Sequence, residues 1–111
     1  MSASSFLGTF KNFSTSQVLN VTVSDDNNGK LEGNIKNSDG TTLSVTGHYH
    51  WIDVNAGTQA SMAFIAITDD PNNYQAWAGL SSADHNTLNM CGGGANGLNP
   101  VMSLDGSWER V

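Results

Sequence analysis

The segment from Gly29 to Tyr49 constrains the fold of this chain more than any other part of the sequence. Polar and apolar residues alternate along two runs within it, Lys30 to Asn37 and Thr41 to Tyr49, which flank a Ser-Asp-Gly turn. A period of two predicts strands with one dry and one wet face, and Asp-Gly between such runs favours a hairpin. We therefore predict an antiparallel β-hairpin in this segment.

Short alternating runs separated by turn residues recur along the rest of the chain. Strands are predicted at residues 6–13, 17–24, 30–37, 41–49 (with an extension to 51 or 54), 58–68, 74–82, 87–91 and 101–111. The glycine-rich segment 92–97 is predicted to be a flexible loop, because it lacks the Lys-Ser/Thr of a phosphate-binding loop. Residues 1–111 are thus expected to form one all-β domain, an eight-stranded antiparallel up-and-down β-barrel, with a β-sandwich as the alternative. The interior of such a barrel is filled by side chains or holds one small ligand at its mouth.

The alternation also predicts which side chains share a face. In the second predicted strand, Leu19, Val21 and Val23 lie on one side. The fifth predicted strand differs because it is apolar on both sides, and Ile65 and Ile67 lie on the side opposite its remaining bulky residues. One side can fill the interior, whereas the other needs a cover. We expect that cover to be another copy of the chain, in a homodimer or homotetramer.

The charge balance excludes two classes of partner. The formal net charge is −6, from four Lys and Arg against ten Asp and Glu. Nucleic acids and anionic membrane surfaces are bound through basic patches, so we expect neither as a partner. No apolar run approaches the roughly 18 residues of a membrane-spanning helix. Residues 1–5 lack the basic and apolar regions of a signal peptide, so a cytoplasmic protein is expected, with secretion of a processed form as the alternative.

The sequence offers no argument for catalysis. No Ser-His-Asp or Cys-His arrangement follows from the spacing, and Cys91 has no basic neighbour to activate it. His48 and His50 lie on one face of a predicted strand, but two imidazoles alone seldom hold a metal ion. We therefore expect a non-catalytic protein with no metal site and no cofactor.

Five short motifs in the chain follow one another in a familiar order. They are Leu7–Asn12 (LGTFKN), Gly29–Gly33 (GKLEG), Thr46–Tyr49 (TGHY), Trp77–Gly79 (WAG) and Gly106–Trp108 (GSW). In order and spacing they resemble strands of the avidin and streptavidin family, and the resemblance spans nearly the whole chain. It implies a homotetramer or homodimer of eight-stranded barrels that bind biotin without catalysis. The pocket of that family joins polar groups around the ureido ring to tryptophans around the apolar part.

The resemblance also implies a set of ligand-binding residues, carried over position by position: Asn12, Ser16, Ile35, Asn37, Thr68, Gln75 and Trp77. Asn12 stands where the family has a donor to the ureido oxygen, and Trp77 where it has one of its cage tryptophans. Ile35 replaces a tyrosine donor, Thr68 replaces a cage tryptophan, and Gly106 replaces an aspartate. Losing a buried hydrogen-bond partner costs about 1–3 kcal/mol, and losing a large aromatic contact about 3–5 kcal/mol. We therefore expect biotin, or a biotin-like polar ligand, to bind weakly.

The other carried-over positions are polar. Asn37 replaces a serine acceptor, and Gln75 occupies the position of a threonine. Ser16 lies near the next serine of the family, but this segment is one residue longer, so Ser14 and Thr15 are alternatives.

The composition and the tryptophans of the chain support a second functional hypothesis, which belongs to a different class of protein. The chain is acidic, helix-free and rich in Asn, Ser, Thr and Gly, and Trp51, Trp77 and Trp108 offer rings on which sugars can stack. These features favour a cytoplasmic carbohydrate-binding lectin of the defence type. Its partner would be a glycan, and an oligomer would gain avidity for clustered sugars.

Overall fold

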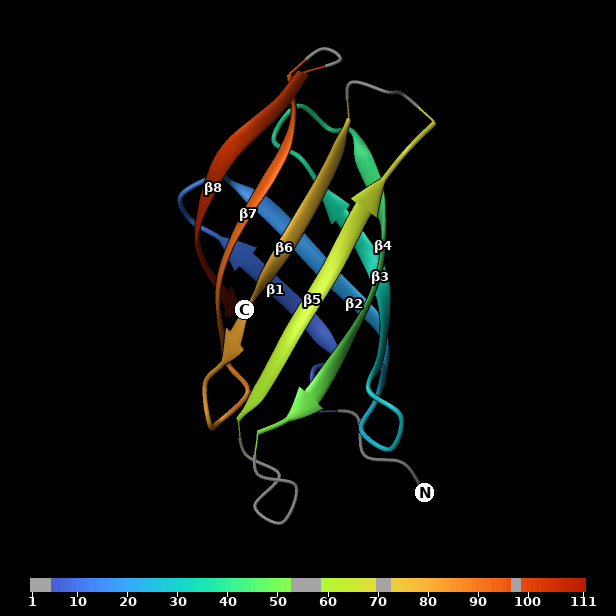
Figure 1. The fold of residues 1–111 in the computed structure, drawn as a ribbon, viewed down its shortest axis with the longest axis vertical. Coiled ribbons are helices and arrows are strands. Elements are labelled where there is room, and N and C mark those ends of the chain that lie inside the picture. Colours follow the sequence, from blue (N-terminus) through green and yellow to red (C-terminus); the bar gives the residue numbers. More distant parts are fainter. Residues whose placement is uncertain (1–4, 53–58, 70–72, 97–98) are drawn as a thin grey trace.

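The chain folds into a closed barrel of antiparallel strands (Figure 1). The computed structural model describes residues 5–52, 59–69, 73–96 and 99–111. The strands are β1 (Gly8–Asn12), β2 (Gln17–Asp25), β3 (Lys30–Lys36), β4 (Thr42–Trp51), β5 (Ala60–Ile67), β6 (Tyr74–Ser81), β7 (Thr87–Asn96) and β8 (Asn99–Arg110). The described residues contain no helix, so the predicted all-β class is confirmed. The predicted start of a strand at residue 58 and the extension to residue 54 lie outside the described ranges.

Each strand pairs with the next one in the sequence, and β8 pairs with β1. The closing pair aligns Phe10 with Arg110, Lys11 with Glu109 and Asn12 with Trp108. This closure confirms the predicted eight-stranded up-and-down barrel and excludes the sandwich, because two separate layers would leave β1 and β8 unpaired.

The two ends of the barrel carry different side chains. One end, the lower one in Figure 1, carries the turns at residues 26–29 and 82–86. We call it the aromatic end, after the rings that gather there: Phe6, Tyr49, Trp51 and His85. The other end carries the turns at residues 13–16 and 37–41 and the start of β6. We call it the amide end, after three side chains that meet there: Gln17, Asn37 and Gln75.

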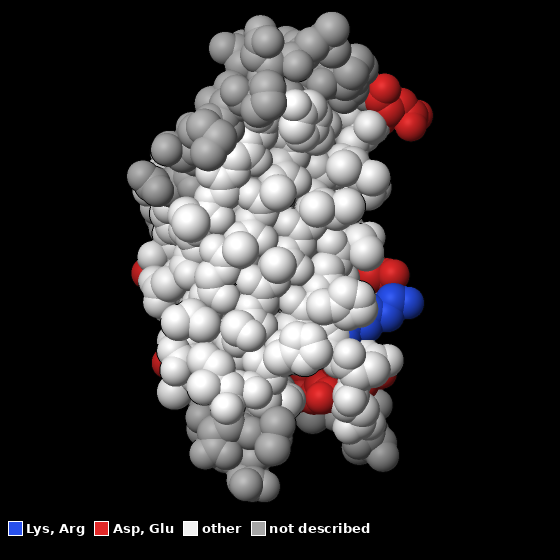
Figure 2. Space-filling model, viewed as in Figure 1, with Lys and Arg blue, Asp and Glu red and all other residues white. Residues whose placement is uncertain are grey.

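The outside of β5 and β6 carries no charged residue (Figure 2). Inward and outward residues alternate along β5 as predicted, so Ile65 and Ile67 are exposed and about half of each side chain is accessible. Leu80 on β6 is also exposed, beside small alanines. We call the following outward residues the outer apolar face: Ala63, Ile65, Ile67, Tyr74, Ala76, Ala78 and Leu80.

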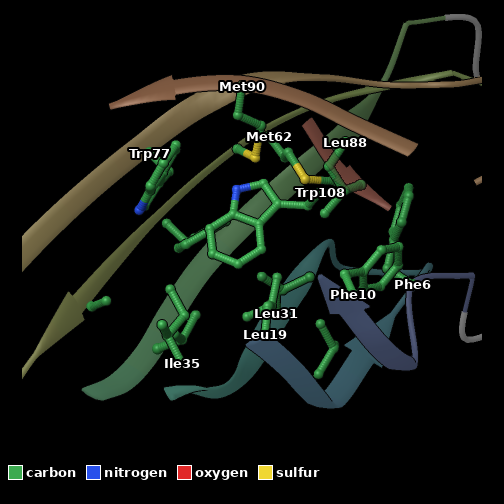
Figure 3. Close-up of a cluster of buried hydrophobic side chains, with 14 of the residues drawn as sticks. Phe6, Phe10, Leu19, Leu31, Ile35, Met62, Trp77, Leu88, Met90 and Trp108 are labelled. Atoms are coloured by element: carbon green, nitrogen blue, oxygen red, sulfur yellow. The ribbon is translucent and has the colours of Figure 1, made fainter. Parts of the chain in front are cut away.

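The middle of the barrel is filled by side chains. Trp108 lies across the interior, with Met62 and Met90 on one side of its ring and Leu19 and Leu31 on the other (Figure 3). All five are buried. The barrel therefore encloses a packed core at mid-height, and space for a ligand must lie toward an end.

One predicted strand face is wrong because β2 contains a bulge. The register with β3 shifts between Val21 and Val23, and beyond this point Ser24 points inward in place of Val23. The Ser24 hydroxyl accepts a hydrogen bond from the Phe6 backbone N–H at 3.1 Å and lies 2.9 Å from the Tyr49 hydroxyl. The bulge thus exchanges an apolar side chain for a polar one where the aromatic end needs a hydrogen-bonding group.

The predicted loop at residues 92–97 is also wrong over its described part. Strand β7 continues to Asn96, and Gly92 pairs with Trp77 on β6. A Cβ atom on Gly92 would lie 2.3 Å from the Ala76 carbonyl oxygen and 2.9 Å from the Trp77 ring. Glycine is required there because the strand passes directly over the indole, so this glycine indicates close packing instead of a loop.

Candidate functional site

A polar pocket of about 250 Å³ lies at the amide end. Its lining residues come from the turns after β1 and β3 and from the first residues of β2 and β6: Thr15, Gln17, Asn37, Ser38, Asp39 and Gln75. Each of these side chains carries a hydrogen-bonding group, and only Asp39 carries a charge. The pocket can therefore recognise a small ligand through several hydrogen bonds at once.

Gln17 is the central residue of this pocket. Its Nε2 atom donates to Asn37 Oδ1 at 2.8 Å and to Gln75 Oε1 at 2.9 Å, and its Oε1 atom accepts from the Thr15 hydroxyl at 2.7 Å. Gln17 belongs to β2 and Gln75 to β6, which face each other across the barrel (Figure 1). We call the contacts of Gln17 with Asn37 and Gln75 the amide bridge. This bridge spans the mouth, and Gln17 itself is only 4% exposed.

The direction of these hydrogen bonds follows from Trp77 at one end of the chain of contacts. The Trp77 indole Nε1–H can only donate, and it lies 3.0 Å from Gln75. Gln75 must therefore present its carbonyl oxygen to Trp77. The same oxygen faces Gln17, so Gln17 must present its NH₂ group.

The contacts of Asp39 independently fix the same direction of these hydrogen bonds. The Asp39 carboxylate accepts from the Thr41 hydroxyl at 2.7 Å and from the Thr41 backbone N–H at 3.0 Å. The Thr41 oxygen then accepts from Asn37 Nδ2 at 2.9 Å, which leaves Asn37 Oδ1 facing Gln17. These contacts, the Thr41 hydroxyl first, also hold the pKa of Asp39 below its usual value.

Two buried donors lie deeper in the barrel. Among the described residues, Asn12 Nδ2 and Trp108 Nε1 are the buried side-chain polar atoms without a hydrogen-bond partner. Their residues face each other in the register of β1 and β8. The Asn12 side chain also lies against Gly106, where an added Cβ would be 2.7 Å from its oxygen. A buried N–H group without an acceptor is costly, so this region favours an acceptor atom, from a ligand or from water.

Four of the residues predicted from the sequence come together at the amide end. Asn37 and Gln75 line the pocket, and Trp77 lies below them, hydrogen-bonded to Gln75. Asn12 is completely buried, and its Oδ1 atom accepts from the backbone N–H groups of Ser14 and Thr15 at 2.9 and 3.2 Å. Asn12 therefore both stabilises its own turn and keeps its NH₂ group directed into the barrel.

The other three predicted residues do not line this pocket. Ser16 is exposed in a left-handed conformation, with φ of 62°, and of its alternatives Thr15 is the one that reaches the pocket. Ile35 is buried in the core and offers no hydrogen bond. Thr68 donates to the Asn73 carbonyl oxygen at 3.3 Å across the turn between β5 and β6.

Gln17 was not predicted as a site residue, and Trp108 was considered only as a ring for sugars, not as a buried donor. Gln17 has the same parity as Leu19 in β2, so the alternation alone would have directed it inward. The role of Trp108 had no sequence signal, because an unpaired indole N–H depends on what surrounds it in the folded barrel.

Other candidate sites from the sequence lie elsewhere. Trp77 and Trp108 are buried and Trp51 is half-buried, so none of them offers an open ring to a sugar. His48 and His50 are exposed on the outside of β4, and the described residues contain no group of three His, Cys, Asp or Glu placed to hold a metal ion. Within the described ranges, no helix has the length and apolarity to cross a membrane.

The fold and the pocket together define a class: a closed eight-stranded barrel with a small polar pocket at one end. Comparisons of the chain with protein-family models, with curated proteins and with solved structures found no match.

Proposed function

We propose that this protein is a non-catalytic ligand-binding barrel that takes biotin or a biotin-like polar ligand weakly at its amide end. The observation that carries this proposal is the pocket of about 250 Å³, whose lining is built from amide and hydroxyl groups and the Asp39 carboxylate. Below it lie two unpaired buried donors, Asn12 Nδ2 and Trp108 Nε1. A cyclic urea offers N–H groups to the amide oxygens and a carbonyl oxygen to donors of this kind.

Three features argue for weak binding. Ile35 supplies no donor, and Thr68 supplies no aromatic contact. The amide bridge also closes the mouth, so a ligand must break the contacts of Gln17 before it can reach the buried donors. Each of these terms subtracts from the affinity that a preformed, open pocket would give.

A thermal-shift titration with biotin, desthiobiotin and simple sugars tests the proposal, because a ligand that binds only the folded state raises its Tm. We expect biotin or desthiobiotin to raise the Tm of the wild type and to lose this effect in Gln75→Ala. Gln59→Ala is the matched control, since Gln59 is exposed and precedes β5 at the aromatic end. Equal shifts in Gln75→Ala and the wild type, or no shift with either compound, would refute it.

A glycan is the second candidate ligand. Asp39 adds an exposed carboxylate to the amides of the same shallow pocket, and Phe13 is an exposed ring in the turn after β1 at this end. Sugar hydroxyls both donate and accept, so they match such a mixed set. Binding on a glycan array that is lost in Asp39→Asn would support this lectin function, and an array without signal would reject it.

We further propose that the protein is a homo-oligomer, a homodimer or homotetramer, assembled through the outer apolar face. This face has a shallow groove of about 620 Å³ over its alanines, bordered by β4 and β7. The chain carries a net charge of −6, yet the outward residues of β5 and β6 are all uncharged. Two copies can therefore meet here without burying a charge, whereas contact through charged surfaces would bring acidic groups together.

Two identical substitutions test the interface. Leu80 lies on the outer apolar face and is 42% exposed, whereas Leu7 is 47% exposed just before β1. We expect Leu80→Lys to reduce the mass measured by light scattering to that of a monomer, and Leu7→Lys to leave the oligomer intact. A wild-type protein with the mass of a monomer at all concentrations would contradict the proposal.

A further inference from the structure

We propose that the amide end is a binding site for a terminal carboxamide or urea group, and that the protein keeps this site filled with its own Gln17 side chain. The inference deepens the proposed function: it names the chemical group that an outside ligand must bring, and exchange with such a ligand rests on that function. The occupied site itself rests only on the hydrogen bonds of Gln17.

The surroundings of Gln17 complement a primary amide. Its NH₂ group meets two acceptors, Asn37 Oδ1 and Gln75 Oε1, and its carbonyl oxygen meets one donor, the Thr15 hydroxyl. Both amide hydrogens and the oxygen are therefore satisfied. Two acceptors and one donor, converging from three separate segments, form a set that selects a carboxamide.

Two of these side chains, and the backbone of the third, are held in place by partners other than Gln17. Gln75 Oε1 also accepts from the Trp77 indole, and Asn37 Nδ2 donates to the Thr41 hydroxyl. The Thr15 backbone N–H donates to Asn12 Oδ1. The site therefore keeps its geometry when the Gln17 side chain is absent. A replacement ligand can then bind without the entropic cost of ordering the site.

The same geometry excludes other groups. A carboxylate or a tertiary amide has no N–H to offer, so it would set its own oxygen or a methyl group against Asn37 Oδ1 and Gln75 Oε1. Sites built to satisfy a donor discriminate strongly against analogues that lack it, because their buried acceptors are then left unpaired. A ligand that takes the place of the Gln17 carboxamide must therefore carry at least two polar hydrogens beside a carbonyl oxygen.

Gln17→Ala provides a direct test. The substitution removes the Cγ methylene and the carboxamide, which together have the atoms of acetamide. We expect acetamide to bind the vacated site and raise the Tm of Gln17→Ala by about 5 °C at saturation. Acetate and N,N-dimethylacetamide should not do so, because neither has an N–H group. Acetamide should not raise the Tm of the wild type, because its site is filled. It should not raise the Tm of Gln59→Ala either, because that variant loses an exposed glutamine away from the site.

The outcomes separate this inference from the proposed function. Equal stabilisation by acetate and acetamide, or equal stabilisation of Gln17→Ala and the wild type, overturns the inference. If Gln17→Ala does not fold alone, the readout is recovery of its near-ultraviolet circular dichroism on adding acetamide, and no recovery overturns it. The double variant with Gln75→Ala should lose the rescue. Rescue by acetamide without any binding of biotin to the wild type would refute the proposed function alone.

Discussion

The two ends of the barrel are closed by side chains of opposite chemistry. At the aromatic end, Phe6 packs edge-on against Tyr49 with ring centroids 4.8 Å apart and against His85 at 5.2 Å, and Trp51 stacks on Phe6 at 6.0 Å. At the amide end, Gln17 closes the mouth through three hydrogen bonds. One closure rests on apolar contact area, and the other on directed polar contacts.

The polar groups of the aromatic end serve its own packing. The Tyr49 hydroxyl donates to Asp26 Oδ1 at 2.6 Å, and the Ser5 hydroxyl donates to the other oxygen of the same carboxylate. Burial, together with the Asp26 carboxylate, raises the pKa of Tyr49 far above its usual range. The phenol therefore remains a donor at all physiological pH values.

Arg110 adds a further connection at the aromatic end. Its guanidinium donates to the backbone carbonyl oxygens of Leu7 at 2.6 Å and of Ser5 and His85 at 2.9 Å each, and it lies over the Phe10 ring. It thereby holds both ends of the chain to the 82–86 turn. The aromatic end is therefore built for stability, whereas the amide end uses contacts that a small molecule can reproduce.

The largest effect is expected from Phe6→Ala at the aromatic end. Phe6 is fully buried among three other rings, so its loss should lower the free energy of unfolding by about 3–5 kcal/mol. Phe13→Ala is the matched control, because Phe13 is 63% exposed and should cost little. Urea denaturation of both variants measures the difference. Similar midpoints for the two variants would show that the aromatic end does not carry the stability assigned to it.

The sequence predicted the barrel because alternation is a local property. Residues such as Leu31 and Ile35 are buried where a period of two directs them. The bulge between Val21 and Val23 was not predicted, because a sequence of alternating residues does not reveal an extra residue in the pairing. The glycines of β7 were interpreted as a loop, since their purpose, to pass over Trp77, depends on a neighbouring strand.

The candidate site was predictable only in part, for a related reason. Asn37, Gln75 and Trp77 were predicted position by position from the family resemblance, and the fold brings them to one end. The amide bridge joins Gln17 to Gln75, which are 58 residues apart, and it exists only because β2 and β6 face each other in a closed cylinder. Its place in the alternation of β2 directs Gln17 inward, but no pattern in the sequence predicts its hydrogen-bond partners.

A pair of matched substitutions tests the direction of the amide bridge, with a smaller expected effect. Gln17→Glu replaces a donor by a carboxylate that faces the oxygens of Asn37 and Gln75, so it should cost about 3 kcal/mol at neutral pH. Gln75→Glu should cost less than about 1 kcal/mol, because Gln75 Oε1 only accepts, from Gln17 and from Trp77.

Chemical denaturation at several pH values measures both variants. The stability difference between them should narrow as the pH falls, since a protonated carboxyl at position 17 can donate again. Equal stability of Gln17→Glu and Gln75→Glu at neutral pH would mean that the hydrogen bonds do not run in the direction given by Trp77 and Asp39.

The smallest effect is expected from protonation of Asp39. It distinguishes the amide end from the aromatic end by their response to pH. Asp84 at the aromatic end forms a similar turn: its carboxylate accepts from the Ser82 hydroxyl at 2.6 Å and from the Asn86 backbone N–H at 3.0 Å. The Ser82 contact first, and then Asn86, lower the pKa of Asp84, as Thr41 does for Asp39. A carboxyl whose folded pKa lies below its unfolded value contributes stability above the unfolded pKa, and this is lost as the pH falls through the folded pKa.

Only Asp39 is connected to the binding site, through Thr41 and Asn37. Protonation of Asp39 removes the preferred acceptor of the Thr41 hydroxyl, so Asn37 Oδ1 is no longer held toward the position of Gln17. The affinity of Gln17→Ala for acetamide should therefore decrease as the pH falls below the usual range of an aspartate, in a titration followed by calorimetry. Adding Asp39→Asn should flatten this pH dependence, whereas adding Asp84→Asn should leave it unchanged. If instead Asp84→Asn abolished the dependence, the acid sensitivity would belong to the barrel as a whole, and the two ends would not be independent.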